Sequence, residues 1–339
     1  MVTVKDIAMI CKVSPATVSK ALNGYEDVNA QTAERIRQTA RKLNYLPNAA
    51  ARQLKTNISN NIGVLFFDET NSGLTHEYFS RILNSAKMAA EELGYDITFI
   101  GRSIVGRKGT FLEHARYRKV DGVLIASVDF KNENVRELVD SEIPTVTIDY
   151  NFPGHASVMS DNVEGGYALG RYLLELGHRR IGVIHGEMTS VTRKRLNGLY
   201  NACREYGVTI PEEYIVEGRY HDAKVSAEAT KRLMELPDRP TAIMYPDDFA
   251  YLGGMAALEN MGLSVPEDVS VTGYDGIPLG QVLRPKLTTY AQNAEEIGVQ
   301  AANKLIRIIE NKDKEKEEEI SVRGRLVAGE SARSIGVFH

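Results

Sequence analysis

The sequence predicts an α/β protein of two similar lobes behind a small all-α headpiece. Residues 1–46 carry three short amphipathic patterns at helical spacing. Residues 61–331 then alternate apolar runs with amphipathic helical stretches, and the runs fall into two groups of four. Continuous apolar strands between such helices are typical of parallel sheets that are covered on both faces. At 339 residues the chain is long enough for two or three compact units.

The headpiece is expected to fold as three helices. The first pattern covers Val4 to Cys11, and the second begins at Pro15 behind a serine, an arrangement that favours a helix start. The second pattern ends near Asn23, which a glycine follows, and the third begins near Asn29. Two helices joined by a turn of three or four residues and braced by a third predict a helix-turn-helix.

The outward face of the second helix consists of small or polar side chains, namely Ala16, Thr17, Ser19, Lys20 and Asn23. A helix that reads bases must enter the major groove, where bulky outward side chains hold it off. Thr17 and Ser19 can bond phosphates or bases. Lys20 can reach guanine acceptors or a phosphate, and the Ala16 methyl can touch a thymine methyl. The alternative is an ordinary small helix whose outer face is only solvated.

Charge is distributed unevenly along the chain. Residues 1–60 contain nine Lys and Arg against four Asp and Glu, a balance of +5, so the remainder carries −9 within the total of −4. Opposite charge on two parts of one chain suggests a basic module that meets a polyanion and a separate acidic body. A short segment can also reach this balance by chance.

The segment 45–59, YLPNAAARQLKTNIS, follows the headpiece. Its proline stops the third helix, and NAAARQLK is helix-prone but has one large apolar residue, Leu54, and is too short to be stable alone in water. A leucine flanked by Arg52 and Lys55 fits the wedge with which minor-groove proteins unstack a base step. The alternative is a plain linker whose leucine packs on a neighbouring domain.

Eight apolar runs predict the strands of the body: 62–67, 96–100, 121–127 and 144–149 in one lobe, and 180–186, 212–218, 240–246 and 268–275 in the other. We expect a break between the lobes near 156–166. The charged run 311–319 is interpreted as a solvated crossover between the lobes. Ligands of such sheets bind outside the carboxyl ends of the strands.

The expected strand ends carry carboxylates, aromatic rings and an arginine, namely Asp149, Arg193, Tyr220, Asp247, Phe249 and Asp275. The carboxylates can accept bonds from hydroxyls, and Arg193 can donate several. Tyr220 or Phe249 can stack on an apolar ring face. Polar groups around an aromatic wall suit a sugar or a similar polyhydroxylated or heterocyclic metabolite. The alternative for each acid is a helix N-cap or a solvated loop.

Signatures of other protein classes are missing from the sequence. It has no Gly-x-Gly-x-x-Gly after the first strand, no phosphate loop and no Gly-x-Ser-x-Gly, which disfavours an enzyme or a nucleotide cofactor. Its seven His and two Cys form no metal spacing, and Cys11 and Cys203 are expected to be buried small hydrophobes. No apolar stretch reaches membrane length and Lys5 and Asp6 interrupt any signal peptide, so we expect a cytoplasmic protein without a cofactor.

Four stretches closely resemble the LacI/GalR transcription factors: VTVKDIAMICKVSPATVSKALNG, RKLNYLPNAAARQLKT, RYLLELGHRRIGVI and PEDVSVTGYDGIPLGQVLRPKLTTYAQ. They stand in the family's order and at its spacing, and the similarity covers essentially the whole chain. The resemblance implies a DNA-binding headpiece at 1–46, a hinge helix and linker at 47–60, and an effector-binding core at 61–331 like the periplasmic sugar-binding proteins. The lobes of that core are expected to comprise 61–160 with 290–318, and 161–289 with 319–331.

The resemblance also implies roles for individual residues. In the headpiece, base-reading positions fall on Ala16 and Lys20, and further DNA contacts fall on Thr3, Pro15, Thr17, Ser19 and Asn23. In the hinge, DNA contacts fall on Asn48, Ala51, Arg52 and, as the intercalating residue, Leu54. Effector positions fall on Asp149, Arg193, Tyr220, Asp247 and Asp275, and His76 and Tyr78 of the loop 68–79 are expected to face the same ligand.

Three departures from the family pattern concern these positions. Lys20 stands where arginine is frequent, so bidentate guanine recognition is weaker there. Asp247 replaces the usual asparagine, which removes a donor and adds an anion. The loop 68–79 is longer than the usual Asp-x-x-Asn-Pro-Phe-Phe form. The last two departures bear on which effector binds.

The resemblance therefore predicts a homodimeric repressor that binds a pseudo-palindromic operator in double-stranded DNA and a small effector, a sugar or a related metabolite. Closure of the lobes on the effector is expected to change the separation of the two hinge helices and so the DNA affinity. The C-terminus has no apolar heptad, so we expect a dimer rather than a coiled-coil tetramer. The rival classes are a periplasmic solute-binding protein, which needs an export signal, and an α/β enzyme, which needs a catalytic set.

Overall fold

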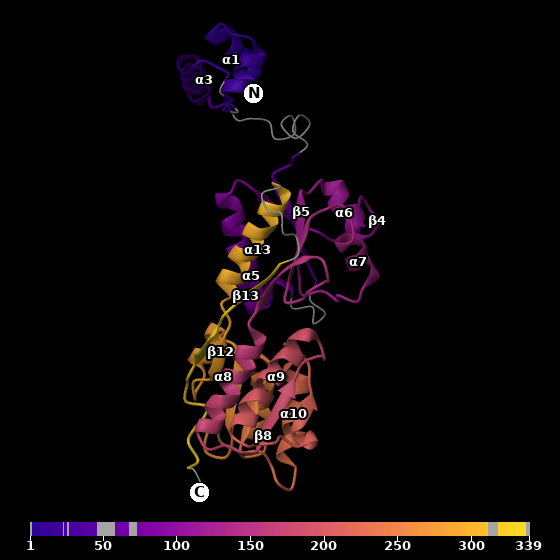
Figure 1. Cartoon of the computed structure of the whole chain (residues 1–339), viewed down its shortest axis with the longest axis vertical. Coiled ribbons are helices and arrows are strands. Elements are labelled where there is room, and N and C mark those ends of the chain that lie inside the picture. The colour runs from indigo at the N-terminus through magenta and orange to yellow at the C-terminus, as the bar shows by residue number, and fades with distance from the viewer. Residues whose placement is uncertain are drawn as a thin grey trace. The chain divides into compact units, whose positions relative to one another are not determined.

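The computed structural model describes residues 2–22, 24–25, 27–45, 58–67, 73–310 and 318–336 (Figure 1). The chain divides into two compact units, Met1–Ser59 and Asn60–His339. The first unit contains the all-α headpiece, and the second contains two large sheets. The predicted fold class, a helix-turn-helix headpiece before a two-lobed core of parallel sheets flanked by helices, is confirmed.

Three helices form the headpiece: α1 (Val4–Cys11), α2 (Pro15–Leu22) and α3 (Ala30–Lys42). These bounds agree with the predicted ones. Ile7, Val18 and Ile36 contribute one side chain from each helix to the centre, and all three are fully buried. Because the apolar stripes of the three helices face one another, their polar faces are left to solvent.

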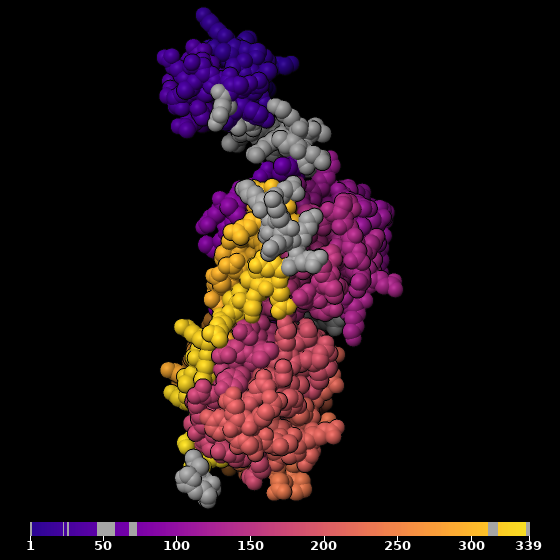
Figure 2. All heavy atoms as spheres, viewed as in Figure 1, coloured from indigo at the N-terminus to yellow at the C-terminus, as the bar shows by residue number. Residues whose placement is uncertain are grey.

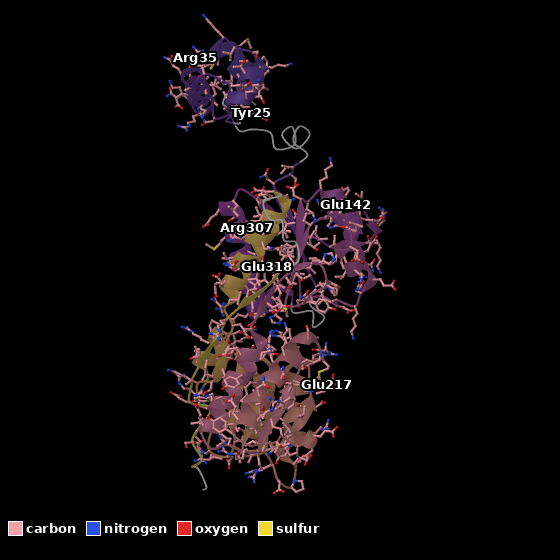
Figure 3. The ribbon with its side chains drawn as sticks, viewed as in Figure 1. Tyr25, Arg35, Glu142, Glu217, Arg307 and Glu318 are labelled. Carbon is pink, nitrogen blue, oxygen red and sulfur yellow. The ribbon has the colours of Figure 1, made fainter. Side chains whose placement is uncertain are left out.

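Short polar side chains close the helix ends of the headpiece. Thr3 and Asp6 form a capping box on α1, in which the Thr3 amide donates to Asp6 Oδ2 at 2.8 Å and the Asp6 amide donates to Thr3 Oγ1 at 3.4 Å. Asn29 caps α3 by accepting a backbone N–H at 3.0 Å. Arg35, labelled in Figure 3, donates to the Cys11 carbonyl at 3.1 Å and ties α3 to the end of α1.

The first lobe of the core is built on a six-stranded parallel sheet. In spatial order its strands are β13 (Glu319–Val322), β7 (Ala156–Ser160), β6 (Thr145–Ile148), β5 (Gly122–Ala126), β1 (Asn61–Phe66) and β2 (Asp96–Phe99). Helices α5 (Glu77–Glu92) and α13 (Ala294–Ile309) lie side by side on one face, and α6 (Phe111–Arg118) and α7 (Glu133–Val139) cover the other (Figure 1). A short turn, η1 (Gly73–Thr75), precedes α5, and a small hairpin, β3 (Ser103–Ile104) and β4 (Arg107–Lys108), precedes α6.

The second lobe contains the other six-stranded sheet. In spatial order its strands are β14 (Arg325–Val327), β12 (Thr288–Ala291), β11 (Ser270–Asp275), β10 (Ala242–Met244), β8 (Ile181–His185) and β9 (Ile215–Glu217). The β14–β12 pair is antiparallel, and the other pairs are parallel. Its helices are α8 (Asn162–Glu175), α9 (Ser190–Glu205), η2 (Glu212–Tyr214), α10 (Ala223–Met234), α11 (Ala250–Asn260) and α12 (Pro278–Val282).

The prediction of four strands in each lobe is wrong. The expected break at 156–166 holds β7 and the start of α8, and each sheet has six strands. Strands β7 and β12 read ASVMS and TTYA, so hydroxyl side chains interrupt their apolar pattern although both strands are largely buried. Most of the charged run 311–319 lies outside the described residues, and its last residue, Glu319, begins β13. Because α13 before the run and β13 after it both belong to the first lobe, the interpretation of the run as a crossover between the lobes is wrong.

The chain passes between the lobes three times: from β7 to α8, from β12 to α13 and from β13 to β14. Figure 2 shows the C-terminal part of the chain, in yellow, lying along both lobes. At two places the predicted limits of the lobes differ from the points where the chain passes between them. Residues 319–322 pair with β7 in the first lobe, where the sequence suggested the second, and β12 extends the second lobe to Ala291.

The two cysteines, Cys11 and Cys203, are free and buried, as predicted. Within the part of the chain that the structure describes, no helix combines the length and apolarity needed to cross a membrane. The same residues hold no group of three or more His, Cys, Asp and Glu that could bind a metal ion.

Candidate nucleic-acid interface and interlobe site

The outward face of α2 consists of small or polar side chains. Its predicted DNA-facing residues are exposed at Pro15, Ala16 and Lys20 and half-buried at Thr17 and Ser19. Ser14 closes the helix start, because its Oγ accepts the Thr17 amide at 3.0 Å and lies 2.8 Å from Thr17 Oγ1. The only long side chain among these five residues is that of Lys20, so the face matches the shape that a major-groove helix needs.

Lys20 is engaged within the headpiece. Its Nζ bonds the Asp27 carboxylate in the segment before α3, and both side chains are about half exposed, at 46% and 53%. A phosphate or a guanine must therefore compete with Asp27 for this cation. Thr3, another predicted contact, is exposed but belongs to the α1 capping box. The remaining predicted DNA contacts, Asn23, Asn48, Ala51, Arg52 and Leu54, lie outside the described residues.

In the core, two aspartates at the carboxyl ends of strands have left-handed backbone conformations. Asp149 follows β6 with φ 59°, and Asp275 ends β11 with φ 103°. Such conformations cost about 1–3 kcal/mol in residues other than glycine and cluster at ligand sites. One aspartate belongs to each lobe. Together with Tyr78, Arg195 and Gln292 they form what we call the interlobe site.

Tyr78 and Gln292 connect the two aspartates. Tyr78 lies in the first turn of α5, and its hydroxyl is 2.9 Å from Asp149 Oδ2 and 3.2 Å from Gln292 Oε1. Gln292 lies on the passage from β12 to α13 and donates from Nε2 to Asp275 Oδ1 at 2.6 Å. A chain of hydrogen bonds therefore runs from one lobe to the other. It brings together three of the predicted effector residues, Tyr78, Asp149 and Asp275.

The arginine at this site is Arg195 rather than the predicted Arg193. Arg193 is exposed on α9 and donates to a carbonyl of the preceding loop at 3.3 Å. Arg195 donates from Nε to Asn162 Oδ1 and from Nη1 to the Pro246 carbonyl, each at 2.8 Å. Its guanidinium lies 3.5 Å from the centre of the Tyr274 ring. Residues two apart on a helix point in nearly opposite directions, so Arg193 and Arg195 lie on different faces of α9.

Asp247 acts in the structure as a backbone acceptor. Its Oδ2 accepts the His221 amide at 2.7 Å, and its Oδ1 accepts the Ala250 amide at 2.6 Å. These bonds join the loop after β9 to the start of α11. The helix-cap alternative considered for this acid is therefore part of its role. Its charge still acts on Asp275 and Arg195, so Asp247 contributes to the field at the interlobe site.

Three aromatic rings stack across the two lobes. His76, the residue before α5, stacks on His221 with ring centres 4.0 Å apart, and His221 stacks on Phe249 at 3.9 Å. The predicted residues His76 and Phe249 thus meet through His221, which was not predicted. Tyr220, the next predicted residue, bonds the Thr192 hydroxyl at 2.8 Å. Its ring and Arg195 help to line a small cavity of about 40 Å³ within the second lobe.

The interlobe site gathers carboxylates in a poorly hydrated environment. Burial raises the pKa of Asp149 and Asp247, and burial followed by the charge of Asp247 raises that of Asp275 well above its usual range. Burial also raises the pKa of the adjacent Asp248 to about 7. Burial opposes the charge of Arg195, but nearby tyrosines and carboxylates raise its pKa, so it remains a cation. One fixed cation among several carboxyl groups can exchange hydrogen bonds with a polyhydroxylated ligand.

Arg195, His221 and Gln292 are the site residues that the sequence analysis missed. Gln292 follows β12, so its place at a strand end would have been evident once that strand was recognised. His221 lies within a stretch that the sequence places after a strand, but no motif marks it. Helical spacing could have identified Arg195. It lies three residues after Thr192 and four before Leu199, so it shares the buried face of α9 with them.

The fold and these two regions define a class of protein in which a helix-turn-helix headpiece precedes a two-lobed ligand-binding core. Comparison with known families agrees with both parts. Residues 3–48 match the family described as bacterial regulatory proteins, lacI family. Residues 171–332 match the periplasmic binding protein-like domain.

A curated relative identifies the family of the whole chain. The HTH-type transcriptional repressor PurR of Vibrio atlanticus (strain LGP32) is 32% identical over 325 residues, which cover 93% of this chain and 94% of that protein. The chain therefore belongs to the LacI family and is a DNA-binding transcriptional repressor rather than an enzyme.

Solved structures of the same family share the fold. The lac repressor dimer bound to operator and the anti-inducer ONPF has a TM-score of 0.78 at 26% identity and covers 98% of this chain and 99% of its own. A LacI family transcriptional regulator from Enterococcus faecium with bound ribose has a TM-score of 0.68 at 26% identity. It covers 81% of this chain and 100% of its own.

Proposed function

We propose that the chain works as a homodimer whose affinity for a pseudo-palindromic operator is controlled by a small effector, a sugar or a related polyhydroxylated metabolite, bound at the interlobe site. In this proposal residues 1–46 read one half-site, residues 47–60 form the hinge, and residues 61–331 sense the effector. The observation that carries it is the strained pair Asp149 and Asp275, which stand on opposite lobes and are joined through Tyr78 and Gln292.

The chemistry of the interlobe site supports a polyhydroxylated ligand. Ligand hydroxyls can donate to Asp149 and Asp275 and accept from Arg195. The face of a sugar ring can pack against a flat side chain such as Phe249. The LacI family regulator from Enterococcus faecium, whose structure contains ribose, shares this fold and supports the same class of ligand.

Control of DNA binding follows from the position of the site. A ligand that bonds aspartates of both lobes favours one angle between them, because it binds that arrangement better than the others. In a dimer this angle sets the separation of the two hinge segments. The hinges are proposed to order together in the minor groove, where Leu54 from each copy wedges a base step. Coupling of this kind is typically about 1–3 kcal/mol.

A thermal-shift screen of monosaccharides and disaccharides tests the effector site on the full-length protein. A sugar that raises the melting temperature should lose about ten- to a hundredfold in affinity in Asp149→Asn and Asp275→Asn, because each change replaces a carboxyl oxygen that can accept a ligand hydroxyl with an amide nitrogen that cannot. Arg193→Gln is the matched control and should bind as the wild type does. A screen without any shift, or a shift unaffected by both asparagine variants, refutes the effector assignment.

Leu54→Ala tests the hinge. Loss of the wedge should weaken binding to a specific operator more than binding to random DNA of the same length, because only the specific complex includes the kinked step. Fluorescence anisotropy titrations at one fixed salt concentration measure both affinities. Equal losses on the two DNAs rule out the wedge.

A further inference from the structure

We propose that the core has a second ligand site, for the phosphate group of a small metabolite, at the passages between the two lobes. The site is a cavity of about 540 Å³ lined by residues that include Arg81, Arg323, Arg325, Glu295 and Gln292. A cavity of this size accommodates a ligand of the size of a sugar phosphate. It differs from the interlobe site, with which it shares one residue, Gln292.

The β12–β14 pair forms the floor of the cavity. Ala291 faces Arg325 in the antiparallel register, and Thr289 faces Val327. The short segments that follow β11 and β13 both pack against this floor. A Cβ on Gly276 would lie 2.3 Å from the Ala291 Cβ, and a Cβ on Gly324 would lie 2.4 Å from the Ala291 oxygen. At these two glycines the backbone of the walls therefore packs closely against the floor.

The charged residues that line the cavity are three arginines and one glutamate. Arg81, which lies on α5, forms two hydrogen bonds with the Glu295 carboxylate. Its Nε and Nη2 each lie 3.0 Å from a carboxylate oxygen. Arg323 is 76% exposed and pairs with Asp161 and with Glu164 of the second lobe, each at 4.0 Å. For Arg325 the structure records no ion pair or hydrogen bond of the side chain among the described residues.

The charge of the lining selects an anion. Within the lining, two positive charges remain after the Arg81–Glu295 pair is set aside, although the chain beyond residue 60 carries −9. Asp161 and Glu164, which lie 4.0 Å from Arg323, are outside the lining. A phosphate ester carries about −1.5 to −2 at neutral pH, which matches this surplus, whereas a single carboxylate leaves half of it unpaired. Guanidinium groups also bind phosphate oxygens in pairs of parallel hydrogen bonds. A phosphorylated metabolite is therefore the class of ligand that fits.

The position of the cavity couples ligand binding there to the angle between the lobes. Two of the three passages line it, at Ala291–Asn293 and Arg323–Arg325. Gln292 in the first of these passages reaches both Asp275 and the Tyr78 hydroxyl of the interlobe site. A ligand that holds the two passages together therefore favours one lobe angle, and through Gln292 it acts on the effector site as well.

Calorimetric titration of the full-length protein with glucose 6-phosphate, fructose 1,6-bisphosphate and glycerol 3-phosphate tests the site, with glucose and gluconate as neutral and singly charged comparators at matched ionic strength. At least one phosphate ester should bind. Its affinity should fall about tenfold or more in Arg325→Gln, because one charged hydrogen bond is lost. Arg232→Gln, an exposed arginine of α10 outside the cavity, is the matched control and should bind as the wild type does.

Four results overturn the proposal. The first is that no phosphate ester binds, and the second is that Arg325→Gln and the wild type bind it equally tightly. The third is that glucose binds as tightly as its phosphate ester. The fourth is that Asp149→Asn abolishes binding while Arg325→Gln does not. The last result places the anion in the interlobe site instead. Saturating phosphate ester should also change the operator dissociation constant by about fivefold or more. An unchanged constant overturns the coupling between this cavity and the lobes.

Discussion

The headpiece and the interlobe site present their functional groups in opposite ways. On α2 the predicted DNA-facing residues Pro15, Ala16 and Lys20 are exposed, and they are held by their own helix and its caps. At the interlobe site Tyr78 and Asp275 are 4% and 7% exposed, and partners far away in the chain hold them in place.

The difference is consistent with what each region is proposed to recognise. Duplex DNA is a rigid polyanion, so a headpiece needs only the right shape and charge on one short helix. A small ligand offers few contacts, and its site must therefore be preorganised by several elements. The consequence is that changes in the headpiece should affect DNA recognition with little effect on folding, whereas changes at the interlobe site should affect both ligand binding and folding.

Arg195→Ala should have the largest effect on stability. It removes a fixed cation together with its hydrogen bonds to Asn162 and to the Pro246 carbonyl, and each hydrogen bond of a charged group contributes about 1.5–3 kcal/mol. Urea unfolding measures the loss. Arg193→Ala removes the same charge from the exposed side of α9 and should cost less than about 0.5 kcal/mol. Similar losses in the two variants contradict the assignment of Arg195 to the site.

Gly166→Ala should have the second largest effect on stability. Its Cβ would lie 1.9 Å from the Arg195 carbonyl oxygen, so α8 and α9 must move apart and carry Arg195 with them. We expect a loss of about 1–3 kcal/mol in the free energy of unfolding and weaker effector binding. Gly101→Ala is the matched control, because no atom lies within 4 Å of a Cβ there. If ligand affinity survives in Gly166→Ala, the packing of these helices does not position the site.

The pH dependence of stability should also come from the core, because all seven histidines lie beyond residue 60. Burial lowers the pKa of His178 from 6.5 to about 4, and its ring bonds Thr241 and the Arg333 carbonyl. A base with a lowered pKa stabilises the fold above its unfolded pKa, and that stability is lost as the pH falls from about 6.5 towards 4. Thermal melting in this range should drop less steeply in His178→Gln than in the wild type.

Lys20→Ala should have the smallest effect on folding. The exposed Lys20–Asp27 pair contributes less than about 0.5 kcal/mol, so urea unfolding should change little. Binding-site selection should nevertheless show an altered preference at one base pair of each half-site. Asp27→Asn frees the same cation and should strengthen operator binding. An unaltered selection profile for Lys20→Ala excludes it from base reading.

The sequence predicted most where structure is local. The bounds of α1, α2 and α3 follow from caps and apolar stripes within a few residues, and all three helices were predicted. The strands that were missed are buried by other parts of the chain, so their hydroxyl-rich sequences, such as TTYA in β12, gave no apolar run. Strand pairing between Glu319 and Ser157 is likewise invisible to any local pattern.

The candidate site was predicted in part for the same reason. Asp149 and Asp275 stand at strand ends, where the sheet rule points directly to them. The choice between Arg193 and Arg195 depends on which face of α9 meets the sheet, and this is set by packing against α8. Gln292 acts through partners in both lobes, so only the assembled core shows its role.

The three passages between the lobes also constrain how such a regulator can be rebuilt by recombination of genes. The headpiece is one contiguous block, and a single splice can exchange it for a block with a different operator preference. Neither lobe is contiguous, so a hybrid that imports one lobe must splice the coding sequence at every passage at once. New effector responses in this lineage should therefore arise by substitution of individual side chains, while new operator targets can arrive in one step.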